Sequence, residues 1–415
     1  MKAIDRTSLP PRGKGKTVLN DAASTELDVQ VELIQMLIPI ALERVNELLQ
    51  DEVTELAGRR YNREAAAYRW GKQRGSVYLG EQKVPITVPR LRDAEHHREV
   101  PLESYHRLQT ARATDEVLFH KILHGLSCRK YKRSVRLIPQ AFGVSAGTVS
   151  RRFVHASAHK LRQLMQRRLE GYEIVALVLD GKALADAQMV VALGITTDGQ
   201  KIILGFVESA SENSQICIDF LRQLVERGLS YQNGLLVVID GAKGFRKAIT
   251  AVFGEHACVQ RCQWHKRENV VAYLPKNQHA AMRQKLQQAY EQPTYEQAKH
   301  ELSKIRQELL RLNQSAVTSL DEGFEETLTL HRLGLFKELS ISLKTTNCLE
   351  SINAHIQRLT GKVTSWRTSD QRHRWLASAL LDVEPQLRKI KGYRYLPLLQ
   401  QALQRHLNIK MAIAA

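Results

Sequence analysis

Two short runs of apolar residues stand near the middle of the chain, and each of them ends on Asp-Gly. The runs are EIVALVLDGK at residues 173–182 and GLLVVIDGAKG at residues 234–244. Neither alternates with polar residues, which predicts strands buried on both faces of a central sheet. Asp180 and Asp240 are therefore expected just past the ends of neighbouring strands, where open α/β sheets gather reactive groups. Asp-Gly is also a common turn opener, so either dipeptide alone fits a simple turn.

The segments around these runs predict the rest of a sheet. AQMVVALGIT and QKIILGFVES flank Asp198-Gly199, which is a strong hairpin signal. Helices are expected at about 213–227, before the second run, and at 243–253, before the short strand ACVQRC. Three antiparallel strands, a helix and a fourth strand beside the first are the order of the ribonuclease H-like fold.

A long helical stretch follows the predicted sheet. Residues 276–340 are rich in Gln, Glu and Lys, and Pro293 separates one helix from the next, so an all-helical insertion is expected. We expect it to pack beside the site formed by the strand ends. Periodic Leu and Ile residues then predict a helix over 346–360, with Glu350 in its first turn.

The N-terminal third changes its period. Residues 27–58 have apolar residues at helical spacing, which predicts one long amphipathic helix or a helix pair, serving as core or dimer seam. SVYLGEQKVPITVPRLRD alternates and predicts a β-hairpin turning at Gly80-Glu81. The preceding RRYNREAAAYRWGKQRG interleaves basic and aromatic residues, which fits either a grip on a phosphate backbone or a solvated basic face over a small core.

A sharper signal for DNA lies between residues 114 and 165. The stretch SCRKYKRSVRLIPQAFGVSAGTVSRRF predicts a helix over about 129–141, a bend at Gly143, and a second helix with Ser145 as its N-cap. In a helix-turn-helix the second helix reads the major groove while basic residues meet phosphates. The candidate contacts are Arg129, Lys130, Lys132, Arg133, Thr148, Ser150, Arg151 and Arg152. The same geometry also occurs as plain packing.

Charge and composition narrow the class of partner. The chain has 61 Lys plus Arg against 43 Asp plus Glu, a formal charge of +18, which favours a polyanion such as nucleic acid. No stretch approaches the roughly 18 apolar residues of a membrane span, and the N-terminus lacks the apolar core of a secretory signal. Five scattered cysteines do not form a disulfide pattern. A cytoplasmic protein associated with the nucleoid is expected.

Cys262 and His265, in CQWHKRENV, have the spacing of metal ligands. With His256 and Cys258 nearby, a zinc site is conceivable. A strand, however, would send His256, Cys258 and Cys262 to one face at stretched spacing, which makes a poor tetrahedron. We favour a local side-chain lock at the end of the strand.

Four motifs together resemble one family: VLDGK, VIDGAKG, CQWHKRENV and TTNCLESIN. Their order, with a helical insertion before the Thr-Thr-Asn-x-x-Glu helix, resembles a bacterial mutator-type insertion-sequence transposase of the DDE class, from roughly residue 30 to 400. The resemblance implies that Asp180, Asp240 and Glu350 are the metal-binding catalytic triad, with Asp180 bridging two ions.

The chemistry makes these residue types intelligible. Phosphodiester cleavage and attack by a 3′-hydroxyl both charge the attacking and leaving oxygens, which two Mg²⁺ ions about 3.5–4 Å apart can stabilise. Magnesium requires hard carboxylate oxygens, so two Mg²⁺ ions are the expected cofactor, with Mn²⁺ able to substitute. Cys262 and His265 are poor ligands for these ions and are kept out of the coordination shell.

The expected function is that of a transposase. It would bind double-stranded DNA at the element's terminal inverted repeats, free a 3′-hydroxyl and join it to target DNA, as a homodimer on DNA and without a membrane partner. Two alternatives are a ribonuclease H-like nuclease that cuts without joining and a domesticated DNA-binding regulator with an inactive core.

The predicted fold is α/β: a ribonuclease H-like mixed sheet with an all-helical insertion, preceded by helical, β-hairpin and helix-turn-helix DNA-binding modules. The expected boundaries are a flexible leader at 1–26, a helical and hairpin module at 27–113, the helix-turn-helix domain at 114–170, the catalytic domain at 171–275 and 341–375, the insertion at 276–340 and a C-terminal helical region at 376–415.

Overall fold

The computed structural model describes residues 39–60, 65–79, 81–109, 112–135, 138, 140–209 and 213–414. The predicted leader, the start of the first helix and the turn residue Gly80 lie outside these ranges. The chain forms two compact units. One comprises the chain up to Leu118 together with Ser127–Ser150, and the other comprises Phe119–Leu126 and the chain from Arg151 onward.

The first unit contains the predicted helix and hairpin. Residues 39–57 are helical, and β1 (Ala67–Leu79) pairs antiparallel with β2 (Gln82–Asp93). The short strand β3 (Glu99–Val100) and helix α2 (Glu103–Leu108) complete the module. Its core includes Val45, Leu49, Val53, Val77, Val88 and Leu91. Much of the basic and aromatic stretch expected before the hairpin is itself part of β1, with a bulge between Arg69 and Gly71.

The predicted helix over 129–141 is wrong. After α3 (Arg112–Leu123), the described residues of this stretch form only the single turn α4 (Tyr131–Ser134), and Val135 is already extended. The reason is a competing partner for the backbone, because Phe142 and Lys83 of β2 each donate an N–H to the other's carbonyl at 2.9 Å.

The second predicted helix is present as α5 (Ala146–Met165), and the bend before it is also confirmed. Gly143 has φ +89°, in the left-handed region that glycine favours. The Ser145 hydroxyl accepts the N–H of Thr148 at 3.3 Å, as an N-cap does.

The second unit is built on a five-stranded mixed sheet in the order β6-β5-β4-β7-β8. Strands β4, β5 and β6 are antiparallel, and β7 and β8 run parallel to β4. This is the predicted strand order and is consistent with a ribonuclease H-like core. The strands are β4 (Ile174–Leu184), β5 (Ala187–Thr196), β6 (Lys201–Ser209), β7 (Leu235–Ile239) and β8 (Ala257–Arg261).

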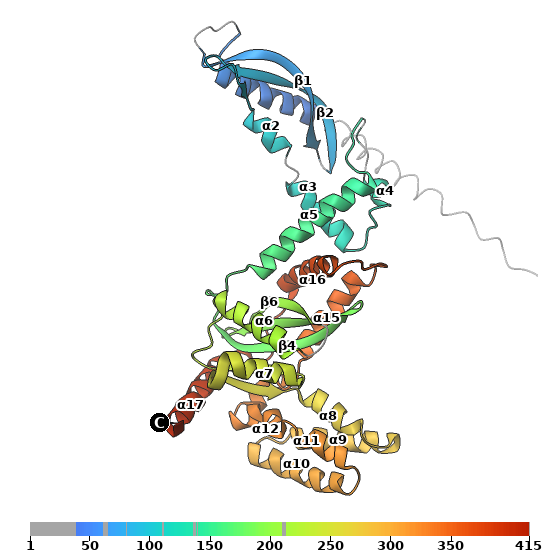
Figure 1. The fold of residues 1–415 in the computed structure, drawn as a ribbon, viewed down its shortest axis with the longest axis vertical. Helices are drawn as coiled ribbons and strands as arrows, with labels where there is room; N and C mark the ends of the chain where they lie inside the picture. Colours follow the sequence, from blue (N-terminus) through green and yellow to red (C-terminus); the bar gives the residue numbers. More distant parts are fainter. Residues whose placement is uncertain are drawn as a thin grey trace, which may run out of the picture. The chain divides into compact units, whose positions relative to one another are not determined.

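Helices cover both faces of this sheet, which explains its continuous apolar runs (Figure 1). The helices α6 (Ser214–Glu226) and α7 (Lys243–Phe253), both as predicted, pack on one face. The other face is covered by α14 (Phe336–Leu343), α15 (Asn347–Thr360), α16 (Ser369–Val383) and α17 (Leu396–Ala414). Short 3₁₀ turns lie at Gly254–His256, Lys276–Gln278, Glu384–Gln386 and Tyr393–Tyr395.

The stretch predicted to be helical after the sheet has a core of its own. That core is formed by the helices α8 (Gln263–Val271), α9 (His279–Tyr290), α10 (Tyr295–Leu310), α11 (Gln314–Asp321) and α12 (Phe324–Thr327). This core extends from Val270 to Leu328. Leu330 of α13 (Thr329–Arg332) already packs into the core under the sheet. No helix among the described residues is both long and apolar enough to cross a membrane.

We predict that Glu384→Ala lowers the free energy of unfolding by about 2–3 kcal/mol. Glu384 forms two hydrogen bonds of 2.7 Å with Arg167 and accepts the N–H of Ile203 in β6 at 2.7 Å. Both side chains of the pair are mostly buried, so the alanine variant leaves charged and polar groups unpaired. Chemical denaturation measures the effect.

The matched control is Glu301→Ala, which removes the exposed Glu301–Lys304 pair and should cost less than about 1 kcal/mol. Equal losses in the two variants would contradict a structural role for Glu384.

Candidate active site

Asp180 and Asp240 come together through the register of two parallel strands. β4 pairs with β7 as far as Leu179 opposite Ile239, so the two aspartates occupy the next position along each strand. Asp180 is 7% exposed. Asp240 is half-buried and accepts the N–H of Ala242 at 3.0 Å.

The sequence predicted that Asp180 lies just past the end of its strand, but Asp180 lies within β4. β4 continues to Leu184, because its other neighbour β5 goes on pairing with it, and Asp180 lies opposite Val191 in that ladder. Only the pairing with β7 stops before Asp180. The carboxylate is therefore held by a continuous strand rather than by a loop.

Glu350 is exposed in the first turn of α15, where its N–H donates to the carbonyl of Thr346 at 3.2 Å. Burial, with the negative charges of Asp240 and Glu350, raises the pKa of Asp180 to about 7, against an opposing effect of His265. The three predicted carboxylates thus act on one another electrostatically, although they come from three separate parts of the chain.

The donor set of this site fits hard divalent cations. Three carboxylates supply the oxygen ligands that Mg²⁺ prefers, and a cation would offset the burial of Asp180. Among the described residues, the ligand atoms of the three side chains do not all lie within 4.8 Å of one another.

Cys262 connects the elements that carry Asp240 and Glu350. It is fully buried at the start of α8, and its N–H donates to the carbonyl of Ile239 at 2.7 Å. Its sulfur accepts the hydroxyl of Thr346, next to α15, at 3.9 Å. A second bond joins the same segments, from the Gln263 N–H to the Lys344 carbonyl at 3.0 Å.

His265 lies one turn further along α8. A hydrogen bond with Cys262, together with the negative charges of Asp180 and Asp240, raises the pKa of His265 to about 9 against the opposing effect of burial. The imidazolium therefore supplies positive charge beside the acidic pair. In the described part of the chain, the ligand atoms of Cys262, His265, His256 and Cys258 do not converge within 4.8 Å.

Two buried cations escaped the sequence reasoning. The Arg261 guanidinium, at the end of β8, donates to the carbonyls of Gly241 (3.0 Å) and Glu322 (2.7 Å). The ammonium of Lys266, only 2% exposed, donates to the Glu322 carbonyl at 2.6 Å, and burial lowers its pKa to about 8. Arg261 fastens the end of α11 to the loop that follows Asp240, and Lys266 fastens it to α8. In the sequence, Arg261 could have been recognised as an arginine at the end of the predicted apolar strand ACVQRC.

The glycine after Asp240 is required by this packing. Gly241 has φ +111°, and a Cβ there would lie 3.1 Å from Nε of Arg261. A side chain at this position would be strained and would also displace the guanidinium. The second Asp-Gly therefore marks both a turn and a close approach of two segments.

Among the other carboxylates near the insertion, Glu268 is already paired. It contacts Arg283 at 2.8 Å and Arg267 at 3.1 Å. Burial acts to raise its pKa, but the hydrogen bonds from these arginines outweigh burial and hold it below the ordinary value. Glu268 is thus a weaker candidate than Glu350 for the third ligand.

The predicted DNA-contacting residues differ in exposure. Arg129, Lys130, Lys132 and Arg133 are exposed around α4. On α5, Ser150 and Arg151 are exposed and Thr148 is half-buried. Arg152 is only 8% exposed, which disfavours a direct contact with DNA.

We predict that Asp180→Asn raises the melting temperature of the metal-free protein at pH 8 by about 3–8 °C. Because the folded pKa of about 7 lies above the ordinary 3.8, the metal-free protein loses stability as the pH rises between these values. Asparagine removes this loss, so the difference should shrink toward pH 4. Scanning calorimetry with and without Mg²⁺ measures it.

Magnesium should stabilise the native protein and have little effect on the variant. Asp219→Asn, an exposed aspartate on α6, is the control and should behave as the native protein does. Unchanged metal-free stability of Asp180→Asn at pH 8 would contradict the electrostatic strain at this site.

Known proteins with this sequence pattern act in transposition. The family profile described as "Transposase, Mutator family" matches residues 13–388. The transposase for insertion sequence element IS256 in transposon Tn4001 of Staphylococcus aureus is 25% identical over 355 residues, 81% of this chain and 87% of that protein. The transposase for ISRM5 of Rhizobium meliloti is 28% identical over 79% of this chain and 81% of its own length. The transposase for IS6120 of Mycolicibacterium smegmatis is 29% identical over 60% and 77%. The chain belongs to the Mutator family of transposases.

Proposed function

We propose that this transposase cleaves DNA at the terminal inverted repeats of an insertion sequence and joins the freed 3′ end to target DNA, using Asp180, Asp240 and Glu350 to hold two Mg²⁺ ions. The observation that carries the proposal is the register of β4 and β7, which sets a buried and a half-buried aspartate side by side. Mn²⁺, which accepts the same oxygen ligands, would substitute.

The three carboxylates have distinguishable roles. Bound cations would stabilise the charge that develops on the attacking and leaving oxygens. Asp180 interacts with both Asp240 and Glu350, which supports a shared ligand position for Asp180. Asp240 would complete the coordination of one ion, and Glu350 would complete that of the other. The continuous β4 strand and the Cys262 contacts hold these side chains in place before DNA arrives.

Cys262 and His265 are proposed to organise the site without binding a metal. Cys262 has hydrogen bonds to the end of β7 and to the residue before α15. His265 places a positive charge next to the aspartates, which would limit their repulsion when no cation is bound. Next to it, Trp264 is largely exposed, with its ring centroid 4.8 Å from that of His265. An exposed indole there suits stacking on a DNA base.

DNA recognition is proposed for α5 and the basic residues around α4. Arg129, Lys130, Lys132 and Arg133 would contact phosphates, and Thr148, Ser150 and Arg151 would approach base edges. The exposure of these side chains and the net charge of +18 support this assignment. Arg152 is left to packing because it is buried. We also propose that the protein acts as a homodimer on DNA, since an element has two ends to be joined.

An assay on a labelled, pre-nicked repeat end separates the proposal from its rivals. Strand transfer supports a transposase, hydrolysis alone indicates a nuclease that does not join, and binding alone indicates a regulator with an inactive core. The complete set of three carboxylates favours catalysis over a regulator.

We predict that Glu350→Gln lowers cleavage and strand transfer by at least about a hundredfold, while folding and repeat binding stay intact. Glutamine removes the negative charge that a metal ligand needs but keeps a hydrogen-bonding side chain, so a capping residue would tolerate it. Glu350 also lies one position beyond the third helical residue, from which a capping carboxylate reaches back.

Glu338→Gln is the matched control, since Glu338 also lies in the first turn of a helix, α14. It should keep native activity. Full activity of Glu350→Gln in Mg²⁺ would remove Glu350 from the catalytic set.

We predict that Arg151→Ala lowers the preference for repeat over random DNA by about 1–3 kcal/mol, if the guanidinium reads a base edge. Competition binding with both DNAs measures this preference. Arg162→Ala, an exposed position further along α5, should leave the preference unchanged. An equal loss on every sequence would instead identify Arg151 as a phosphate contact.

A further inference from the structure

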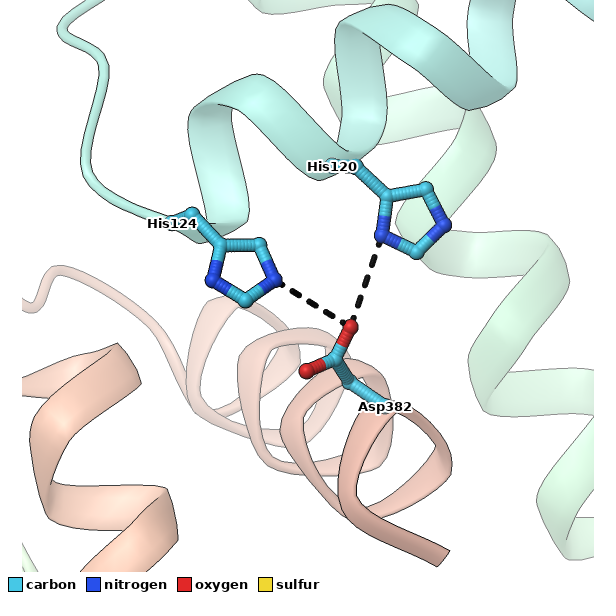
Figure 2. Close-up of side chains that lie close together, drawn as sticks. All are labelled: His120, His124 and Asp382. Atoms are coloured by element: carbon cyan, nitrogen blue, oxygen red, sulfur yellow. Dashed lines mark hydrogen bonds and ion pairs between the residues drawn. The ribbon is translucent and has the colours of Figure 1, made fainter. Parts of the chain in front are cut away.

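A second group of metal-ligating side chains lies outside the catalytic site. His120 of α3 and His124, the residue directly after the end of that helix, are one turn apart and face Asp382 of α16 (Figure 2). All three belong to the same compact unit. Among the described residues this is the only group of His, Cys, Asp or Glu in which three ligand atoms lie within 4.8 Å of one another.

Two nitrogen-to-oxygen distances in this group match the separation of ligands around a metal ion. Nδ1 of His120 and Nε2 of His124 each lie 3.4 Å from the same oxygen, Oδ1 of Asp382. Ligands at about 2.0–2.1 Å from a tetrahedral zinc ion are separated by about 3.3–3.4 Å. Hydrogen bonds between nitrogen and oxygen are usually shorter, at about 2.7–3.2 Å.

The residue types and their spacing support the same reading. Two histidines at positions i and i+4 of a helix present their rings on one side, as in zinc-binding helices. Here the rings are nearly parallel, with an interplanar angle of 26°. The Asp382 side chain is 9% exposed, so a carboxylate with little access to water faces two imidazole nitrogens, and divalent transition-metal ions accept this donor set.

We propose that His120, His124 and Asp382 bind one divalent transition-metal ion, with Zn²⁺ as the best fit. Two imidazoles and one carboxylate suit zinc better than magnesium, which prefers oxygen. Because both imidazoles are about half exposed, water can occupy the fourth position. The ammonium of Lys362 donates to the His124 carbonyl at 3.2 Å, so this cation is directed at the backbone.

The bound ion would fasten α3 to the helix pair that carries Glu350. Leu376 and Leu380 of α16 share a core with Leu349 of α15. An ion that holds α16 in place would therefore also stabilise α15, the helix that carries Glu350. This role is structural and does not depend on the proposed chemistry of the triad.

The test is a zinc titration of the full-length protein after chelator treatment, in excess Mg²⁺ to occupy the carboxylate triad. Isothermal titration calorimetry gives affinity and stoichiometry, and the visible spectrum of a Co²⁺-loaded sample reports tetrahedral nitrogen and oxygen ligation. The variants are His124→Gln, which is exposed and should fold, and Asp382→Asn. The matched control is His96→Gln, because His96 also lies 3.3 Å from an aspartate, Asp93, but has no second histidine in a ligand group.

We expect one zinc ion per chain and a rise in melting temperature on binding. Affinity should fall by more than about tenfold in both cluster variants, and should be unchanged in His96→Gln, Asp180→Asn and Cys262→Ser. Zinc binding that survives in both cluster variants would overturn the proposal. So would binding that is lost in Asp180→Asn, which would assign the zinc to the catalytic carboxylates, or in Cys262→Ser, which would assign it to the Cys-x₂-His motif.

Discussion

The parallel pairing of β4 with β7 is the constraint on which the rest of the site depends. Its register ends at Leu179 opposite Ile239, one residue before both aspartates. A shift of one residue in either strand would turn its aspartate toward the opposite face of the sheet. Because the strands are covered on both faces by apolar clusters, such a shift would also bury the wrong side chains. The core therefore enforces the spacing of the carboxylates.

Contacts at the ends of the strands extend this order to the third carboxylate. Cys262 has hydrogen bonds to Ile239 and to Thr346, so the end of β7 and the beginning of α15 share one buried residue. Arg261 adds the loop after Asp240 and the end of α11 to the same assembly. Each of these hydrogen bonds satisfies a buried polar atom that would be costly to leave unpaired. The end of α11, in the insertion, therefore lies beside the loop that follows Asp240.

The electrostatics of the site follow from the same geometry. Burying Asp180 beside other carboxylates raises its pKa to about 7, and the metal-free fold tolerates this partly through the charge of His265. Because the charged form of Asp180 is unfavourable when no cation is bound, binding of cations at this site is expected to stabilise the fold. The His120, His124 and Asp382 group is different in kind, since its imidazoles and single carboxylate suit a softer ion than magnesium.

The sequence by itself predicted most of the elements around the main site and suggested its chemistry. Apolar runs and helical periodicity predicted β5, β6, β7, β8, α6, α7 and α15 almost to the residue, because burial imposes a period on the side chains. The residue types Asp, Asp and Glu indicated hard cations for the same local reason. Which distant segments pair through backbone hydrogen bonds was decided only by the tertiary structure.

Three differences show why. β4 runs past Asp180 because β5 continues to pair with it, and the expected helix at 129–141 is lost because Phe142 pairs with Lys83. His120 and His124, at the end of α3, lie beside Asp382, which is 258 residues after His124 in the sequence. Each outcome depends on a contact between distant segments, and neither periodicity nor local propensity carries information about such contacts.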